Sequence, residues 1–302
     1  MCTETIQLPS PAQMAQRLSR ILPRFTQVRW VQQTGSTNPD LMHQARNPDG
    51  QIVRPWLLGA HHQTQGRGRG GKTWDNAPGT QLMFSCAFDV FLPSRQLPTL
   101  SPLMGVAACQ ALRGLLPPFA QQTLCLKWPN DIMWGHAKMA GILTEVTRAS
   151  TARLSADHFV VVVGIGINLR QGQQLSEKLN RPIADWGQLC QTHPQVGSHQ
   201  PEHIVAAIAH RWWQQLNLVT TSGLGHLVQE YQDVDYLYRL PIDIVHDGQI
   251  THSGIAAGIN ARGQLLVQMG THTKAVSVGE ISIHTQHQRL GVSAQPAQRG
   301  QP

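Results

Sequence analysis

The segment that most constrains the fold is a basic, glycine-rich run at residues 66–73. Its letters, GRGRGGKT, satisfy the P-loop pattern G-x-x-x-x-G-K-[ST], which binds phosphate only where a strand precedes it and a helix follows. A strand is predicted before it, over residues 56–60. Pro78 and Gly79 come soon after it, and together they break a helix within one turn. The sequence therefore argues against a P-loop nucleotidase, although glycines and arginines together still favour a phosphate-binding loop.

Helices and strands alternate along the first 170 residues, as apolar periodicity and turn residues indicate. The predicted helices cover residues 11–22, 39–46 and 99–116, and the predicted strands cover 25–31, 56–60, 81–90, 142–146 and 159–167. The last two strands are apolar runs, which is typical of strands buried on one or both faces. Segment 171–200 is polar and predicted to be a loop, and helical periodicity returns over 202–219 and 224–238.

From residue 241 onward the pattern changes to short strands separated by turn residues. Three hairpin-like turns, at 247–248, 260–263 and 269–270, fall within about thirty residues and predict a small β-barrel. The final stretch, 286–302, is rich in Gln, Pro, Gly and Ala and is expected to be disordered.

The composition excludes several classes of protein. Of 302 residues, 41% are hydrophobic and 14% charged, and the net charge of +7 comes from mostly scattered basic residues. No run approaches the roughly 18–20 apolar residues of a membrane span, and no secretory signal is visible. The five cysteines are an odd number without C-x-x-C spacing, which argues against a disulfide framework. A folded, cytoplasmic protein is expected.

Three further motifs suggest chemistry, although each also has a purely structural explanation. Residues 127–131, KWPND, form either a rigid turn or a set of oxygen ligands near a magnesium ion held through substrate phosphates. Residues 138–143, KMAGIL, begin with a lysine that alone would be an ordinary surface residue. Residues 164–168, GIGIN, place two glycines in a strand, where they usually mark a close approach of ligand or backbone.

The order of the motifs is more specific than any one of them. Residues 36–38 (STN), 63–70 (QTQGRGRG) and the three motifs above follow one another in a series that closely resembles the biotin–protein ligases, or biotin–[acetyl-CoA-carboxylase] ligases, over about residues 25–285. The resemblance implies an α+β fold, with a mixed β-sheet and helices in a catalytic domain of the class II aminoacyl-tRNA synthetase-like, biotin–lipoate ligase type. It also implies a small C-terminal SH3-like β-barrel. The expected units are an N-terminal helical segment (1–24), the catalytic domain (25–238), the barrel (239–285) and the tail (286–302).

The resemblance implies that ATP and biotin are the substrates of the chain and that Mg²⁺ assists. Such an enzyme makes biotinyl-5′-adenylate and then passes biotin to one lysine of a biotin carboxyl carrier protein of acetyl-CoA carboxylase. Fixed cations would lower the repulsion between the carboxylate and the triphosphate. A homodimer is one further expectation, because relatives often dimerise.

The same resemblance assigns residues to roles. The residues expected to act on the reacting groups are Lys138, Arg67 and Arg69. Those expected to bind biotin are Ser36, Thr37, Asn38, Gln63, Arg67, Gly68, Arg69, Trp74, Lys138, Gly141, Gly164 and Gly166. Those expected to bind ATP are Arg67, Arg69, Lys127, Asn130, Lys138 and Asn168. Asp131 is the expected protein ligand near Mg²⁺, and no residue stands out as a general base.

Two departures from the family pattern and several alternatives accompany this interpretation. Only 35 residues precede Ser36, too few for the DNA-binding repressor domain of some relatives, so no DNA binding is expected. Some relatives carry an arginine where this chain has His284. A lipoate–protein ligase of the same fold, a nucleic-acid-binding module and a carrier-docking protein that consumes no ATP remain alternatives.

Overall fold

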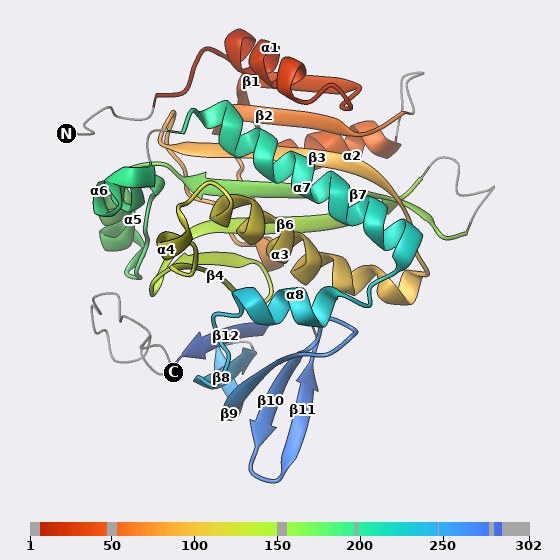
Figure 1. Ribbon diagram of the computed structural model, residues 1–302, viewed down its shortest axis with the longest axis vertical. Helices are drawn as coiled ribbons and strands as arrows, with labels where there is room; N and C mark the ends of the chain where they lie inside the picture. The colour runs from red at the N-terminus through yellow and green to blue at the C-terminus, as the bar shows by residue number, and fades with distance from the viewer. Residues whose placement is uncertain are drawn as a thin grey trace.

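The computed structural model of the chain describes residues 7–46, 53–149, 156–196, 199–246, 248–277 and 281–285. A seven-stranded mixed sheet forms its centre, with the strand order β1-β2-β3-β7-β6-β5-β4 (Figure 1). Its strands are β1 (Gln27–Thr34), β2 (Trp56–Gln63), β3 (Gln81–Phe91), β4 (Leu124–Lys127), β5 (Asp131–Trp134), β6 (Ala137–Arg148) and β7 (His158–Asn168). Strands β1 and β2 run parallel, and every other neighbouring pair in this order runs antiparallel.

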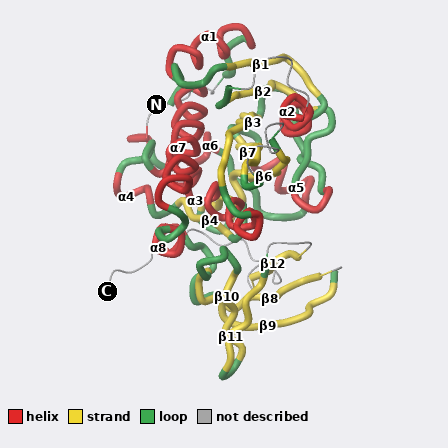
Figure 2. Tube along the Cα trace, turned by 90° about the vertical axis from the view of Figure 1, so that its right-hand side faces the viewer, coloured by secondary structure: helices red, strands yellow, loops and turns green. Residues whose placement is uncertain are grey.

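Helices cover the two faces of this sheet unequally. The α-helices are α1 (Pro11–Ile21), α2 (Thr37–Arg46), α3 (Leu100–Arg113), α4 (Pro118–Gln121), α5 (Gly172–Leu179), α6 (Trp186–Thr192), α7 (Pro201–Ser222) and α8 (Leu227–Val234). Figure 2 shows α1, α3 and α7 on one side of the sheet and α2 and α5 on the other.

The alternation of side chains along β7 explains the two layers, because successive residues of a strand point to opposite faces. Val161 and Val163 belong to the large core beneath α3 and α7. Val160 and Val162 pack in a smaller core with Leu41 of α2. Both faces of the strand are thus buried along this half of its length, as its continuous apolar sequence predicts.

The structure confirms the predicted strands and most predicted helices, with boundaries that shift by a few residues. The prediction of a loop over 171–200 is wrong, since α5 and α6 lie within it. Helix α6 begins with a capping box, in which Asp185 accepts a hydrogen bond from the backbone of Gln188 and the Gln188 side chain accepts one in return. Short helices of this kind depend on such caps more than on apolar periodicity.

The C-terminal residues form a second, five-stranded antiparallel sheet. Its strands are β8 (Pro241–His246), β9 (Gln249–Ile259), β10 (Leu265–Met269), β11 (His272–Val276) and β12 (Ile281–Thr285). Their order is β11-β10-β9-β8-β12, and within the described residues no pairing joins β11 to β12. The hairpins are confirmed, whereas the closed barrel is not. The tail predicted over 286–302 lies outside the described residues.

A buried tryptophan connects the two sheets. Trp128 is 2% exposed, and its Nε1 donates a hydrogen bond of 3.0 Å to the carbonyl oxygen of Gly263, in the turn between β9 and β10. Gly263 has a φ of 69°, and a Cβ there would lie 2.9 Å from Pro102 of α3. The turn of the C-terminal sheet is thereby held against the motif of residues 127–131.

We expect Trp128→Phe to lower the free energy of unfolding by about 1–3 kcal/mol more than a matched change, because it leaves the Gly263 carbonyl without its buried donor. Trp186→Phe is the match: Trp186 is 0% exposed, and its Nε1 has no hydrogen-bond partner among the described residues. Both changes remove the same ring atoms. Equal losses in denaturant unfolding would show that the hydrogen bond contributes nothing.

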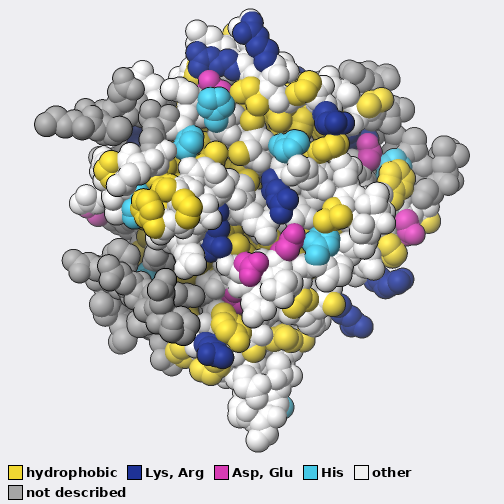
Figure 3. Space-filling view, viewed as in Figure 1, with side chains coloured by type: hydrophobic (Ala, Val, Ile, Leu, Met, Phe, Trp, Pro, Cys, Tyr) yellow, Lys and Arg dark blue, Asp and Glu magenta, His cyan; other side chains and the backbone are white. Residues whose placement is uncertain are grey.

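The molecular surface agrees with the scattered basic residues of the sequence. On the face in Figure 3, Lys and Arg side chains are dispersed among hydrophobic and neutral ones instead of forming one patch. None of the helices that the structure describes has the length and apolar character needed to cross a membrane.

Candidate active site

Three of the glycines predicted to bind biotin, Gly141, Gly164 and Gly166, lie on the face of the sheet that carries α2 and α5. Gly141 of β6 pairs with Gly166 of β7, and a Cβ at Gly166 would overlap the indole ring of Trp74. A Cβ at Gly141 would lie 3.1 Å from the same ring and 3.2 Å from Lys138 Nζ. The two glycines thus form a floor on which the Trp74 ring and the Lys138 ammonium group lie.

The basic loop is a short hairpin. Arg67 and Thr73 form a β-bridge, and the Trp74 N–H donates to the Gly66 carbonyl oxygen at 2.9 Å. Gly70, with a φ of 60°, lies in the tight turn between them, a conformation that glycine adopts without a steric cost. No helix follows Thr73, so the prediction that this loop is not a P-loop is confirmed.

Polar side chains form a buried chain at the other end of this face. Thr37 Oγ1 and Ser85 Oγ lie 2.6 Å apart, and Ser85 Oγ lies 2.6 Å from Asn38 Oδ1. Gln63 Oε1 accepts the Thr37 N–H at 2.8 Å. A Cβ at Gly164 would overlap Asn38 Oδ1. The structure therefore brings Thr37, Asn38, Gln63 and Gly164 together.

A second cluster gathers the predicted cations. Lys138 Nζ forms an ion pair of 2.7 Å with Asp131, and it lies 5.6 Å from the centre of the Trp74 ring. Arg69 Nη1 donates to Asn130 Oδ1 at 3.2 Å. Burial lowers the pKa of Arg69 and Asp131 partly offsets this, yet an arginine remains charged at neutral pH. Two fixed cations therefore lie beside one carboxylate.

Lys127 lies in the same cluster and differs from the other two cations. Burial lowers its pKa to about 8, with the nearby Lys138 and Arg181 acting in the same direction and Asp131 opposing them. Lys127 therefore changes its charge within the range of pH in which enzymes are normally assayed.

Asn168, which was predicted to bind the nucleotide, forms hydrogen bonds to other parts of the protein in this structure. Its Nδ2 donates to the carbonyl oxygens of Ala184 and Lys138, at 3.1 and 3.5 Å, and its Oδ1 accepts from Gln81 at 3.1 Å. Gln81 also donates to the Asp75 carbonyl oxygen at 3.0 Å. Asn168 thereby ties the strand of Lys138 to the end of the basic loop.

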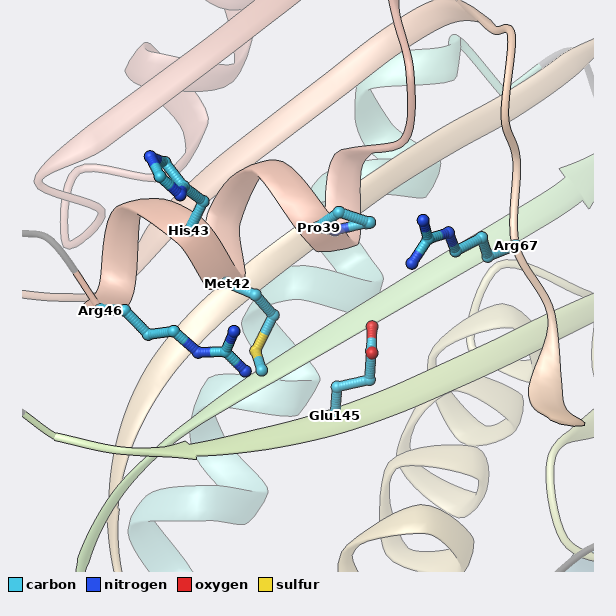
Figure 4. Close-up of a pocket in the computed structure, with 6 residues that line it drawn as sticks. All are labelled: Pro39, Met42, His43, Arg46, Arg67 and Glu145. Atoms are coloured by element: carbon cyan, nitrogen blue, oxygen red, sulfur yellow. The ribbon is translucent and has the colours of Figure 1, made fainter. Parts of the chain in front are cut away.

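Of the three residues predicted to act on the reacting groups, Arg67 lies apart from the cluster of Lys138 and Arg69. It lines a pocket of about 270 Å³ together with residues of α2 and β6. The other lining residues are Pro39, Met42, His43, Arg46 and Glu145. In Figure 4, Arg67 and Glu145 point into this space from different walls. Arg67 thus faces the polar chain and Arg69 faces the Lys138 cluster.

Three further residues from the sequence analysis lie near these groups or in the C-terminal sheet. Ser36 is buried at 6% exposure before α2, Gly68 N–H donates to the Lys72 carbonyl oxygen in the loop, and His284 is exposed on β12 opposite Asp243. Within the described ranges, no group of three or more His, Cys, Asp and Glu side chains could hold a metal ion.

Sequence reasoning missed Ser85, Gln81 and Glu145. Asn38 Nδ2 donates to Glu145 Oε2 at 2.9 Å, which extends the polar chain to β6. One signal was available: Gln81 and Ser85 are polar residues with the same parity in a strand whose other face is continuously apolar. Such residues point to a polar site on the second face of the strand.

This fold and site define a class of protein. Residues 34–168 match the biotin/lipoate A/B protein ligase family. Over 252 residues the chain is 29% identical to the biotin–[acetyl-CoA-carboxylase] ligase of Mycobacterium tuberculosis, an alignment that covers 83% of this chain and 86% of that protein. It is 27% identical to the bifunctional ligase/repressor BirA of Escherichia coli, covering 75% of this chain and 65% of that one.

Solved structures share the fold. The biotin protein ligase from Aquifex aeolicus, in complex with biotin and ATP, superimposes with a TM-score of 0.65 at 22% identity. The match covers 87% of this chain and all of that chain. At this identity the likeness establishes the α+β architecture alone.

Proposed function

We propose that this chain is an ATP-dependent biotin–protein ligase. It joins biotin to ATP, which gives biotinyl-5′-adenylate and pyrophosphate, and it transfers biotin to a lysine of the biotin carboxyl carrier protein of acetyl-CoA carboxylase. The observation that carries the proposal is the single glycine-floored face on which the polar chain of Thr37, Ser85 and Asn38 and the cation cluster of Lys138 both lie. The relative from M. tuberculosis, aligned over most of both chains, supports it.

The first step brings two anions together. A carboxylate oxygen of biotin attacks the α-phosphorus of ATP, a P–O bond forms, and pyrophosphate leaves with the electrons of the broken P–O bond. Lys138 and Arg69 would stabilise the negative charge that gathers between the two groups, and such fixed charges are most effective where water is excluded. The Trp74 ring, lying on Gly141 and Gly166, would exclude it.

The second step is acyl transfer to an amine. The uncharged lysine of the carrier attacks the carbonyl carbon of the adenylate, a C–N bond forms, the C–O bond to AMP breaks, and a proton is released. A free lysine has a pKa near ~10.4, so little of the acceptor is neutral at pH 7. Positioning next to an activated anhydride would supply most of the rate.

The donors present suit a magnesium ion carried in with ATP. Asp131 offers a hard oxygen next to Asn130, and Mg²⁺ favours sites with one or two carboxylates plus substrate phosphates. When bound, the ion would neutralise phosphate charge. Asp131 now pairs with Lys138, so phosphate and metal would share these two groups in the loaded enzyme.

The finer features of the proposal follow the resemblance. Residues 25–238 would form the catalytic domain, preceded by the helical segment 1–24, and the sheet over 239–285 would correspond to the family's SH3-like domain. We also propose that the enzyme acts in the cytoplasm and forms a homodimer.

The polar chain favours biotin over lipoate. The ureido ring of biotin carries two N–H donors and a carbonyl acceptor, whereas the dithiolane ring of lipoate carries no hydrogen-bonding group comparable to these. An apolar ring against Thr37 and Asn38 would offer no donor to the remaining lone pairs of their side-chain oxygens, whereas the ureido N–H groups would.

The proposal is tested by transfer of labelled biotin to a purified biotin carboxyl carrier domain with ATP and magnesium. Label is expected on the carrier domain and not on a carrier variant whose acceptor lysine is replaced by arginine. A protein that labels the carrier with lipoate in place of biotin would keep the fold and overturn the substrate.

We expect ATP binding at pH 8.5 to take up a proton on Lys127. The lowered pKa of about 8 leaves most of this lysine neutral at that pH, and an adjacent polyphosphate favours its charged form. ATP affinity should accordingly fall as pH rises through 8. Calorimetry in buffers of different ionisation enthalpy should give an uptake of roughly half a proton or more for each ATP bound. The Lys127→Arg variant should lack the proton uptake that comes from Lys127, because arginine is always charged. Equal uptake by both proteins would exclude Lys127.

A further inference from the structure

The orientation of the Asn38 amide is determined by two neighbours that can only accept. Its Nδ2 lies 2.9 Å from Glu145 Oε2 and 3.2 Å from the Leu143 carbonyl oxygen. An ionised carboxylate and a backbone carbonyl have no proton to donate. The amide nitrogen must therefore face β6, and Oδ1 must face Ser85.

The orientation of the Asn38 amide also decides which atom donates in each of the next hydrogen bonds of the chain. Because Asn38 Oδ1 only accepts, the hydroxyl proton of Ser85 is used at that 2.6 Å contact. Ser85 Oγ must then accept the proton of Thr37 Oγ1, also at 2.6 Å. Thr37 Oγ1 also lies 3.2 Å from Gln63 Oε1, but that oxygen already accepts the Thr37 backbone N–H at 2.8 Å, and the contact with Ser85 is the shorter one. The side-chain protons of Thr37, Ser85 and Asn38 thus point along the chain toward β6, where Glu145 and the Leu143 carbonyl oxygen accept the last two.

The direction of the chain decides what it offers to a ligand. With all protons directed toward β6, the oxygen atoms of Thr37 and Asn38 keep lone pairs and act as acceptors, and Ser85, which is 0% exposed, connects the two. The complementary ligand group is a pair of N–H donors, such as the two nitrogens of a ureido ring. Glu145 is half-buried, and in Figure 4 its carboxylate points into the pocket that Arg67 also lines.

We propose that Glu145 is a positioning residue for biotin: as the acceptor at the end of the chain, it orients Asn38 and, through the buried Ser85, Thr37, so that Asn38 and Thr37 present lone pairs to the ureido N–H groups. This inference rests on the proposed function. A glutamine at this position could donate as well as accept, which would leave the Leu143 carbonyl oxygen as the one acceptor of this pair that holds Asn38 Nδ2 toward β6. Turning over of the Asn38 amide would then cost less, and the reversed chain would set donor against donor in the biotin site.

The test is biotin binding by calorimetry to wild type, E145Q and the matched control E177Q. Glu177 is an exposed glutamate of α5, and its Oε1 accepts a hydrogen bond of 3.3 Å from Gln173 on the same helix. E145Q is expected to weaken biotin binding by about 10–100-fold, the effect of one or two misdirected buried hydrogen bonds. Its KM for ATP should stay within about twofold of wild type, and E177Q should bind biotin normally.

A second variant separates orientation of the chain from a local structural effect. S85A cuts the chain between Asn38 and Thr37 and should itself weaken biotin binding about tenfold. E145Q should then add less than about threefold in the S85A background, because its effect is transmitted through Ser85. Biotin binding by E145Q equal to wild type, or independent effects of the two changes, would overturn the role of Glu145. A wild-type protein that binds no biotin would overturn the proposed function as well.

Discussion

Lys138→Ala is expected to lower the rate of biotin-dependent ATP–pyrophosphate exchange by about 10²–10³-fold, the usual cost of removing one group that stabilises developing charge in a closed site. Lys138 Nζ lies beside both Asp131 and the Trp74 ring, in the cluster where the carboxylate and the α-phosphate would meet. Without Lys138, fewer fixed cations would offset the repulsion between the two anions, and Arg69 would be the main one. The fold should survive, because the Lys138 side chain is partly exposed.

Lys274→Ala is the control for this change. Lys274 also has a polar partner, His252, at 2.7 Å, but it lies in the C-terminal sheet. Its variant should exchange at the wild-type rate. If K138A retained more than about a third of wild-type exchange, the proposed role of Lys138 would be wrong.

Gly164→Ala is expected to raise the dissociation constant for biotin by about a hundredfold. The new Cβ would overlap Asn38 Oδ1 and lie 2.8 Å from Ser85 Oγ. Gly164 is paired on both sides, with Ser85 of β3 and Leu143 of β6, so the strand cannot retreat and the polar chain must move. Two hydrogen bonds that orient the site would be broken, at about 1–1.5 kcal/mol each with some overpacking added.

Gly225→Ala provides the comparison for that variant. A Cβ at Gly225 would meet nothing within 4 Å, and Gly225 is not among the glycines with positive φ. The control should bind biotin as wild type does, in the same titration calorimetry experiment. A dissociation constant for G164A within threefold of wild type would show that Asn38 and Ser85 do not form the biotin site.

The apolar sequence predicted most of the central sheet because its strands are buried on both faces. Residues 81–90 and 159–167 correspond closely to β3 and β7. Helices α5 and α6 escaped prediction because they are short and largely polar, and tertiary contacts such as the Asp185 cap hold them. Whether a small sheet closes into a barrel depends on pairing between its first and last strands, which local patterns do not specify.

The sequence motifs identified the runs of residues that make up the candidate site, but not the hydrogen bonds that join one run to another. Residues 36–38 and 138–143 could be found because each is a compact run. Ser85 and Glu145 could not, because their importance comes from the register that places β3 and β6 on either side of Gly164. Arg67 and Arg69 have similar sequence surroundings, and only the turn of the loop shows that they face different groups.

The most direct test of the proposed ligase is ATP–pyrophosphate exchange on the purified protein, with magnesium present, no carrier added, and biotin and lipoate as parallel substrates. Exchange that depends on biotin and is absent with lipoate is the predicted result, because adenylation alone reverses to scramble label between ATP and pyrophosphate. Exchange with lipoate alone would contradict the assignment of the polar chain to a ureido ring. A folded protein that exchanges with neither substrate would contradict adenylation by this site.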